Sequence, residues 1–405
     1  MMKSFMWITL LLTVISLVGC ARITPTPLPA TEEIELPPPT DIVTPSPIPI
    51  SITVPTLPDT PTPNPNSETF AYGPKDFPEN INPLTGMEVA DLELLDRRPL
   101  SVKVQLFPRG QRPPWGVNTA DLVFDYYQNN GLTRLNSVFY GKDAEVVGPI
   151  RSARLFDANV VQMYKAILAF GGADSRILKK FYGYDFADRM VLEGNQKCPP
   201  MCRIDPESFN YLVTNTAELT KYADENGIPN EPQDLTGMSF NSQVPSGGQS
   251  SQQIFTRYSI SSYDRWDYDP SSGRYLRFQD TQEAHTEAEE VYAPLTDQLS
   301  NSQISTDNVV IIFAVTEFVY RSQSGNSEIV DIELDGSGDA LAFRDGQVFQ
   351  VKWNRPKKDS VLYLTFQDGS LYPYKPGTTW YQVLGKSSQV EQRGEGVYRI
   401  VFNTP

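Results

Sequence analysis

Residues 148–172 read GPIRSARLFDANVVQMYKAILAFGG, and the periodicity of the chain changes within this stretch. Three segments before it, 100–106, 120–127 and 132–140, are rich in Val, Phe and Tyr and predict strands. After Gly148-Pro149 the apolar residues recur at helical spacing, at Leu155, Val160, Met163, Tyr164, Ile167 and Leu168. The stretch therefore predicts a helix that ends at Gly171-Gly172, within a layered domain of mixed α and β structure.

Outward from this stretch, the pattern divides the chain into a first half of mixed α and β structure and a second half that is rich in strands. Short helices are expected at 174–181 and 216–225, and the segment 234–253 is polar and rich in Gly and Ser. Beyond it, the nearly continuous apolar run 309–315 predicts a strand that is covered on both faces. Alternating residues on either side of Asp345-Gly346, and again of Asp368-Gly369, predict hairpins.

These patterns predict an α+β protein with five parts. We expect a signal peptide at 1–20, a disordered stalk at 21–78, an α/β domain at 79–232, a linker or long loop at 233–253 and a mostly antiparallel β domain at 254–405. The stalk assignment depends on composition, because segments such as TPTPNP at 60–65 favour extended conformations and contain too few apolar residues for a core.

The N-terminus predicts a lipid anchor. Lys3 precedes an apolar run at 5–18, which is too short for a stable transmembrane helix of about 20 residues. The run closes with Leu17-Val18-Gly19-Cys20, which resembles the lipobox of bacterial lipoproteins. That resemblance implies lipidation of the Cys20 sulfur, cleavage before Cys20, and location at the outer face of the bacterial cytoplasmic membrane. An ordinary cleaved signal peptide or a short anchor helix is the alternative.

Charge and residue usage exclude several classes of function. The chain carries 34 Lys and Arg against 49 Asp and Glu, a net charge of −15, so a nucleic-acid partner is not expected. With one His, His285, a Ser-His-Asp triad would have to use that residue. After Cys20, the remaining cysteines are Cys198 and Cys202, for which a disulfide, two free thiols and a redox-active pair are all open.

The candidate binding residues cluster around the start of the predicted helix. Arg134 ends a short motif on a predicted strand, and Arg151, Ser152 and Arg154 follow Gly148-Pro149. Guanidinium groups bind phosphate or carboxylate with two donors, and free N–H groups at a helix start add to them. We therefore predict an anion pocket here. The alternative is a structural lock, in which these arginines pair with Asp121, Asp125 or Asp157.

Carboxylates in the same region allow a further interpretation. Asp121, Asp125, Asp157 and Asp174 could hold a hard cation through their oxygens, but their spacing does not support a metal site. We accordingly expect no metal and no cofactor.

Several motifs together resemble the YerB-like bacterial lipoproteins. They are Asn82-Pro-Leu-Thr-Gly86, Gly131-Leu-Thr-Arg134, Gly148-Pro-Ile-Arg-Ser-Ala-Arg154, Tyr263-Asp-Arg-Trp266 and Pro376-Gly-Thr-Thr-Trp380. The resemblance spans nearly all of the chain after the stalk. It implies a cell-surface lipoprotein with a layered α/β N-terminal part and no assigned biochemical activity.

Function is expected to be binding rather than catalysis. The leading hypothesis is an envelope module that binds a cell-wall glycan, a phosphate-bearing lipid or an envelope protein. An enzyme acting on phosphate-containing cell-wall precursors, with the arginines stabilising charge and an Asp as base, is the alternative. A purely structural interaction protein is the third hypothesis, and it predicts an exposed apolar patch.

Overall fold

The computed structural model describes residues 70–194, 198–205, 211–324 and 327–403. The predicted signal peptide, Cys20 and all but the last residues of the predicted stalk lie outside the described residues. The described residues belong to one compact unit. Among the described residues, no helix is long and apolar enough to cross a membrane.

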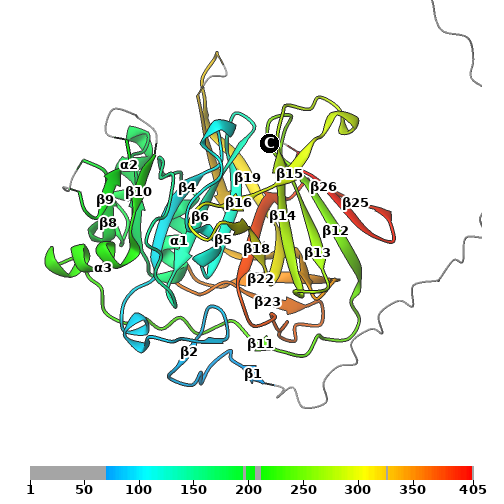
Figure 1. The fold of residues 1–405 in the computed structure, drawn as a ribbon, viewed down its shortest axis with the longest axis horizontal. Helices are drawn as coiled ribbons and strands as arrows, with labels where there is room; N and C mark the ends of the chain where they lie inside the picture. The colour runs from blue at the N-terminus through cyan, green and yellow to red at the C-terminus, as the bar shows by residue number, and fades with distance from the viewer. Residues whose placement is uncertain (1–69, 195–197, 206–210, 325–326, 404–405) are drawn as a thin grey trace, which may run out of the picture. The chain divides into compact units, whose positions relative to one another are not determined.

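Strands dominate this unit, and its three described α-helices lie between residues 157 and 225 (Figure 1). The helices are α1 (Asp157–Tyr164), α2 (Ser175–Phe181) and α3 (Thr216–Glu225). The strands of the first half are β1 (Ala71–Tyr72), β2 (Ile81–Asn82), β3 (Met87–Glu88), β4 (Leu100–Gln105), β5 (Leu122–Asn129), β6 (Leu132–Phe139), β7 (Ile167–Phe170), β8 (Met190–Leu192), β9 (Met201–Arg203) and β10 (Leu212–Thr214).

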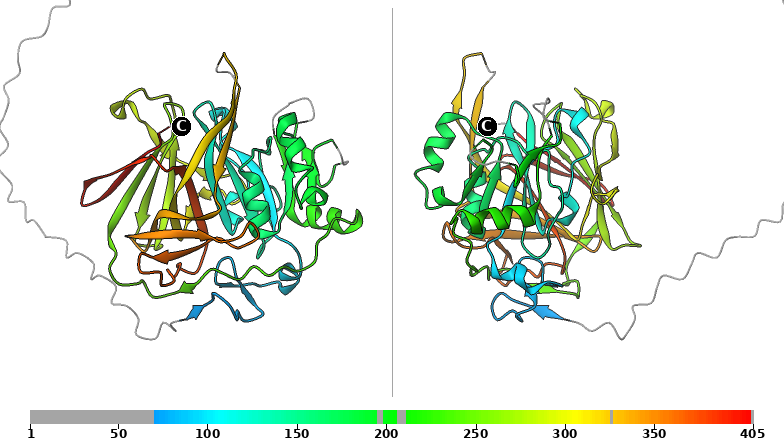
Figure 2. Two further views of the ribbon diagram at one scale, coloured as in Figure 1. Left: turned by 180° about the vertical axis from the view of Figure 1, so that it is seen from behind. Right: turned by 60° about the vertical axis from the view of Figure 1, so that its left-hand side comes forward.

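The second half is built from strands and short turns. Its longer strands are β12 (Gln249–Arg257), β13 (Tyr263–Asp269), β14 (Arg274–Asp280), β19 (Asn308–Arg321), β20 (Glu328–Glu333), β21 (Gly336–Arg344), β22 (Gln347–Arg355), β23 (Tyr363–Phe366), β24 (Thr379–Gly385), β25 (Gln389–Gly394) and β26 (Gly396–Val401). The β19–β20 hairpin, in yellow, extends beyond the rest of the unit in both views of Figure 2. The predicted hairpin around Asp345-Gly346 is confirmed as β21–β22.

One helix prediction was wrong in its length. The helix α1 ends at Lys165, which has a left-handed backbone with φ of 52°, and the chain then re-enters the sheet as β7. The four residues of β7 are buried and pair in parallel with β4 and β8, so long-range pairing overrides the helical spacing. The helices predicted at 174–181 and 216–225 are confirmed as α2 and α3. Asp174 and Asn215 cap them by accepting backbone N–H groups.

A parallel strand pair, β5–β24, joins the two halves, and further parallel pairs lie within the second half. The strand β24 runs parallel to β5 and also parallel to β19, and β12 runs parallel to β26. The strand-rich half is mostly antiparallel, as predicted, and it also contains the parallel pairs β12–β26 and β19–β24. In addition, β12 begins at Gln249, inside the segment predicted as a linker. Eighteen strands from both halves are connected by pairing in the described part of the chain.

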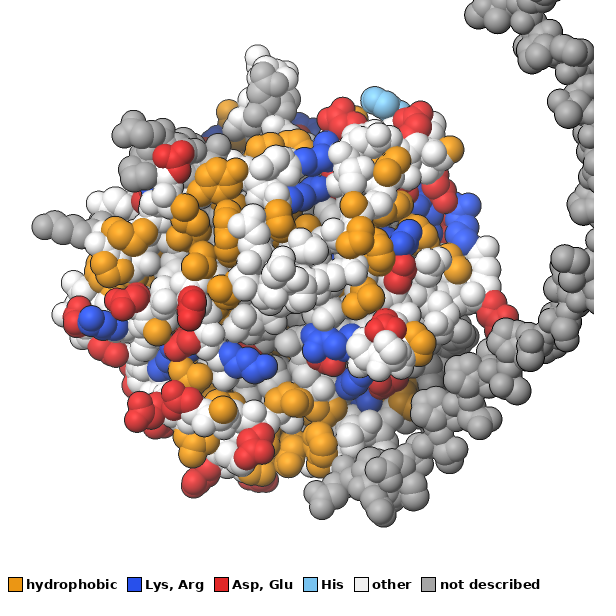
Figure 3. All heavy atoms as spheres, viewed as in Figure 1, with side chains coloured by type: hydrophobic (Ala, Val, Ile, Leu, Met, Phe, Trp, Pro, Cys, Tyr) orange, Lys and Arg blue, Asp and Glu red, His pale blue; other side chains and the backbone are white. Residues whose placement is uncertain are grey.

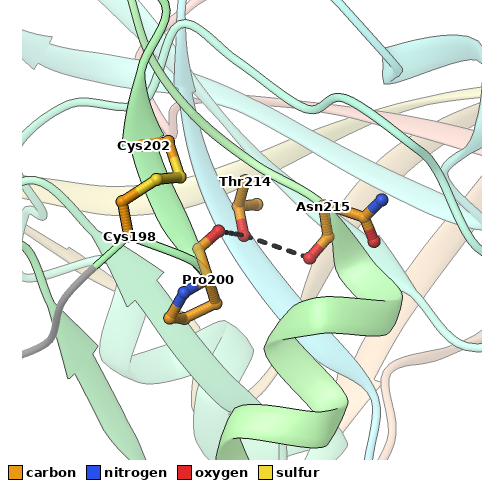
Figure 4. The surroundings of a disulfide bond; sticks show 5 residues. All are labelled: Cys198, Pro200, Cys202, Thr214 and Asn215. Carbon is orange, nitrogen blue, oxygen red and sulfur yellow. Dashed lines mark hydrogen bonds between the residues drawn. A yellow bond between two sulfur atoms is a disulfide. The ribbon is translucent and has the colours of Figure 1, made fainter. Parts of the chain in front are cut away.

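Cys198 and Cys202 form a disulfide beside β10 (Figure 4). Near it, the Thr214 hydroxyl donates a hydrogen bond of 3.0 Å to the carbonyl oxygen of Pro200. This bond ties the disulfide loop to the strand β10, which in turn contacts the stretch that precedes α1: Ile150 N–H donates to the Leu212 carbonyl at 2.6 Å.

Candidate anion-binding site

The stretch 148–154 is held between two strands that separate. The parallel strands β4 and β7 pair from Leu100 to Val102 on the β4 side, and beyond Val102 the chain segment 151–153 lies between them. Arg151 N–H donates to the Lys103 carbonyl at 3.1 Å, and the Arg151 carbonyl accepts from Gly171 N–H at 3.1 Å. The segment thus occupies the gap at the carboxyl ends of parallel strands, where ligands of α/β sheets commonly bind.

Gly172 is required for this arrangement. Gly171 N–H donates to the Arg151 carbonyl, and the Gly172 carbonyl accepts from Ala153 N–H at 2.7 Å. Gly172 has φ of 142°, a conformation that residues with a side chain rarely adopt. The Gly171-Gly172 pair therefore does more than end β7, because its backbone fixes the position of the arginine segment.

Two arginines converge on one carbonyl oxygen. Arg134 Nη1 donates to the Ser152 carbonyl at 2.6 Å, and Arg154 Nη1 donates to the same oxygen at 3.3 Å and to the Ala153 carbonyl at 2.9 Å. We call Arg134 and Arg154 the arginine pair. Within the described chain, neither member forms an ion pair with a carboxylate, and both are half-buried. Burial, and then the adjacent Arg154 guanidinium, lower the pKa of Arg134 to about 9.

Arg151 and Ser152 lie on the same segment as the pair. Arg151 Nη2 lies 3.5 Å from Gln111 Oε1, so its head points toward a different neighbour from that of the arginine pair. Ser152 contributes its main-chain carbonyl to the pair rather than its hydroxyl. Of the predicted residues, then, Arg134, Ser152 and Arg154 share a contact, and Arg151 is beside them.

Beneath the arginine pair lies a buried polar network around Asp157. This carboxylate accepts hydrogen bonds from the Tyr126 hydroxyl at 2.7 Å, the Asn136 amide at 2.9 Å and the Arg154 main-chain N–H at 2.6 Å. Lys103 Nζ forms an ion pair with it at 3.3 Å, and both side chains are fully buried. Lys103 also donates a hydrogen bond to the Tyr126 hydroxyl. Asp157 is therefore occupied by four partners and is out of contact with water.

Burial also changes the charge state of Lys103. Desolvation lowers the pKa of its ammonium group to about 7, although Asp157 opposes this shift. Lys103, Tyr126 and Asn136 were missed from the sequence. A signal existed: Ser101, Lys103 and Gln105 alternate with apolar residues on β4, yet all three are buried, so both faces of this strand are covered. Alternation of this kind ordinarily indicates a solvated face, which explains the omission.

The other two predicted aspartates lie elsewhere. Asp125, on β5, forms a buried ion pair with Arg277 Nη2 at 2.8 Å. Asp121, at the start of β5, accepts from Asn82 and from two main-chain N–H groups, those of Tyr140 and Gly141. The three carboxylates that the sequence offered as partners for the arginines are thus distributed over three separate places. No group of three or more His, Cys, Asp or Glu suited to a metal ion occurs in the described ranges.

Acidic and basic side chains are unevenly distributed over the surface. On the face shown in Figure 3 the acidic side chains are concentrated at the lower left, near α3 in Figure 1, whereas Lys and Arg side chains are scattered through the middle. The net charge of −15 is therefore compatible with a local excess of positive charge. Lys103, Arg134 and Arg154 all interact electrostatically with the carboxylate of Asp157, and Arg154 also interacts with that of Asp174.

Comparisons with known proteins identify relatives for most of the chain. Residues 84–229 match the N-terminal domain, and residues 254–381 the C-terminal domain, of a family described as a protein of unknown function, DUF3048. The chain is 24% identical over 327 residues to YerB of Bacillus subtilis (strain 168), whose name designates it a lipoprotein, and this match covers 78% of the chain and 89% of YerB. A crystal structure of the Bacillus subtilis YerB protein shares the fold, with a TM-score of 0.60 and 22% identity over 75% of this chain and 96% of that one.

Proposed function

Since this chain belongs to the YerB-like DUF3048 family, we propose that it is a lipid-anchored protein of the bacterial cell envelope whose folded body binds an anionic group at the arginine pair. A membrane-anchored envelope location is consistent with the lipoprotein name of its relative. Attachment through Cys20 and residence on the outer face of the cytoplasmic membrane are our extension of that finding, based on the sequence Leu17-Val18-Gly19-Cys20.

One observation carries the binding proposal. Arg134 and Arg154 share the Ser152 carbonyl, and neither has a carboxylate partner in the described chain. Two half-buried cations held together without a counter-ion are unfavourable alone, and an anion that accepts from both would relieve their repulsion. Each charge-assisted hydrogen bond to such an anion contributes about 1.5–3 kcal/mol. A phosphate or carboxylate group has the geometry to accept from both guanidinium groups.

The charge distribution favours phosphate over carboxylate. Lys103 lies beneath the pair and belongs to the same positive region, since Arg134 and Arg154 both contribute to its lowered pKa. The basic groups Lys103, Arg134 and Arg154 outnumber the nearby carboxylates of Asp157 and Asp174, and the resulting local excess of positive charge favours an anion that carries more negative charge. A phosphate-bearing lipid or a phosphate-bearing wall polymer is the ligand class that we propose.

A catalytic role is less well supported. An enzyme acting on phosphate-containing precursors would need an Asp that can reach the ligand as a base. Asp157 is fully buried with its oxygens occupied, and the more exposed Asp174, which also interacts electrostatically with Arg154, is paired with Arg176 and caps α2. We therefore favour binding without turnover.

The binding proposal is tested with inorganic phosphate and the full chain. We expect phosphate to raise the melting temperature of the wild type at constant ionic strength, because a ligand that binds only the folded state stabilises it. At a phosphate concentration 100 times Kd, the free energy of unfolding is expected to rise by about 2.7 kcal/mol. In the double variant Arg134→Gln/Arg154→Gln this gain should disappear.

The matched control removes two exposed lysines of α2, in Lys179→Gln/Lys180→Gln. It lowers the net charge equally but should keep the full response to phosphate. An equal response of both double variants would show that phosphate acts through general charge effects, and the proposal for the arginine pair would be wrong.

Anchoring is tested independently of binding. We expect Cys20→Ser to move the protein from the membrane fraction to the soluble fraction or the medium, because a thioether-linked lipid cannot form without the Cys20 sulfur. Fractionation followed by immunodetection measures this, with Cys198→Ser as the control that should stay with the membrane. Retention of the Cys20→Ser protein in the membrane would contradict the lipid anchor and leave the binding proposal intact.

A further inference from the structure

A cavity of about 140 Å³ lies where segments that are distant in the sequence meet, and the arginine pair does not line it. Its lining includes Asn82, Glu88, Thr119, Asp121, Lys142 and Thr378. Its volume is close to that of a cavity of roughly 150 Å³ that accommodates one benzene molecule. Parts of both halves of the chain thus enclose room for one compact chemical group.

Two glycines let the main chain close around this cavity. A Cβ atom on Gly377 would lie 2.2 Å from Asp307 Oδ2, and one on Gly141 would lie 2.5 Å from Asn82 Nδ2. Gly377 also has φ of 136°, which disfavours any residue with a side chain. Because these glycines have no side chain, the main chain packs closely against Asp307 and Asn82, and both polar residues line the cavity.

Asp121 is the most unusual group in the lining of this cavity. It is only 4% exposed, and its oxygens accept from Asn82 Nδ2 at 3.0 Å, Tyr140 N–H at 2.6 Å and Gly141 N–H at 3.0 Å. These donors are neutral, and Asp121 forms no ion pair within the described ranges. Asp307, in contrast, is paired with Arg274 at 3.4 Å. Lys142 and Arg97 act on Asp121 without forming an ion pair with it, so a cationic ligand in direct contact would stabilise this buried carboxylate further.

From this geometry we infer that the cavity binds the primary ammonium group of a compact amine, with Asp121 as the anionic anchor. An ammonium group has three N–H donors, and Thr119 and Asn82 also line the cavity as residues with oxygen acceptors. An ammonium group fits better than a metal ion, because the described chain lacks a cluster of three carboxylate, thiol or imidazole ligands. Burial raises the pKa of Asp121 to about 6, which leaves the carboxylate charged at neutral pH.

The test uses alaninamide as the amine probe and N-acetylalaninamide as its uncharged match. Titration of the full chain at pH 7, followed by calorimetry or by NMR shifts, should show binding of alaninamide and at least tenfold weaker binding of the acetylated probe. We expect Asp121→Asn to weaken alaninamide binding at least tenfold. The matched variant Glu317→Gln, on an exposed position of β19, should bind as the wild type does.

Lys142 provides a variant with the opposite sign. It lines the cavity and is exposed. Its ammonium group is attracted to the Asp121 carboxylate and therefore competes with an added amine for this interaction. We expect Lys142→Gln to strengthen alaninamide binding by about two- to threefold. Equal binding of the two probes, or unchanged binding in Asp121→Asn, would overturn the inference.

Because Asp121→Asn could fail to fold, the wild type supplies a second readout. Between pH 7 and pH 5 Asp121 becomes protonated, and alaninamide binding should weaken about tenfold. The charged groups around Asp121 are Arg97, Lys142, Arg274, Glu88 and Asp307. An affinity that stays constant from pH 7 to pH 5 would exclude Asp121 as the anchor.

Discussion

Arg277 and the arginine pair show two ways in which this fold uses guanidinium groups. Arg277, on β14, is fully buried, and its Nη2 lies 2.8 Å from Asp125 and 3.1 Å from Asp264. Its guanidinium carbon lies 4.9 Å from the ring centroid of Trp266 and 5.0 Å from that of Trp380. Arg134 and Arg154 are half-buried, bind main-chain carbonyls and have no carboxylate partner in the described chain.

The difference is one of compensation. Two carboxylates compensate Arg277, and it has no contact with water, so it is committed to structure. Burial raises the pKa of Asp264 to about 8. The negative charge opposite Arg277 is therefore not divided equally between Asp125 and Asp264. The arginine pair lacks such compensation and is placed at the end of parallel strands, so its charge remains available to an incoming anion.

The largest expected effect on stability follows from substitution of Arg277. Arg277→Met keeps an apolar side chain between the two indoles but leaves Asp125 and Asp264 without their cation. We expect the free energy of unfolding to fall by about 3–5 kcal/mol, as when one partner of a buried pair is removed. Urea unfolding followed by Trp fluorescence measures this loss.

Arg134→Met is the matched substitution in the other region. It removes a bond to a carbonyl and also the repulsion with Arg154, so the free energy of unfolding should change by no more than about 1 kcal/mol. Equal losses in Arg277→Met and Arg134→Met would show that the two environments are energetically alike, and the comparison would fail.

A smaller effect sharpens the comparison at Lys103, which is buried like Arg277 but lies beneath the arginine pair. The folded-state pKa of Lys103 is about 7, below the unfolded value of about 10.4, so below pH 7 the folded state carries the full penalty of a buried charge. As the pH rises from 7 toward 10, this penalty is relieved. Between pH 7 and pH 8.5 the wild type should gain about 1.5 kcal/mol relative to Lys103→Met.

Urea unfolding at several pH values measures that difference. The exposed Lys180→Met is the control, and its difference from the wild type should not vary with pH over the same window. If Lys103→Met likewise differs from the wild type by a constant amount, the ammonium group is charged throughout, and its pKa lies in the ordinary range.

Local sequence patterns predicted the local elements. The short helices α2 and α3 were predicted, and the structure shows that Asp174 and Asn215 cap them; helix formation of this kind depends on residues within one or two turns. The strand β7 was not found, because its identity depends on pairing with β4, far away in the sequence. The parallel pair β5–β24 was likewise out of reach, since it joins residues near 125 to residues near 382.

The candidate site was predicted in part for the same reason. Arg134, Arg151 and Arg154 could be selected because a GPIRSAR segment follows a strand that carries Arg134 near its start. Their relation to the carboxylates could not be deduced, since Asp125 pairs with Arg277, 152 residues away. Lys103 and Tyr126 were overlooked because a polar residue on a strand reveals nothing about which element covers it.

The pairing of β5 with β24 also determines when this protein can finish folding. While residues 379–385 are still missing from a growing chain, the edge of β5 that they later cover has unpaired main-chain groups. Within the described ranges, residues of the first half do not pair with this edge of β5, so an isolated N-terminal product keeps an unpaired strand edge that can pair with other chains. Synthesis of nearly the whole polypeptide must precede the last step of assembly, and a premature stop before β24 yields a chain prone to aggregation.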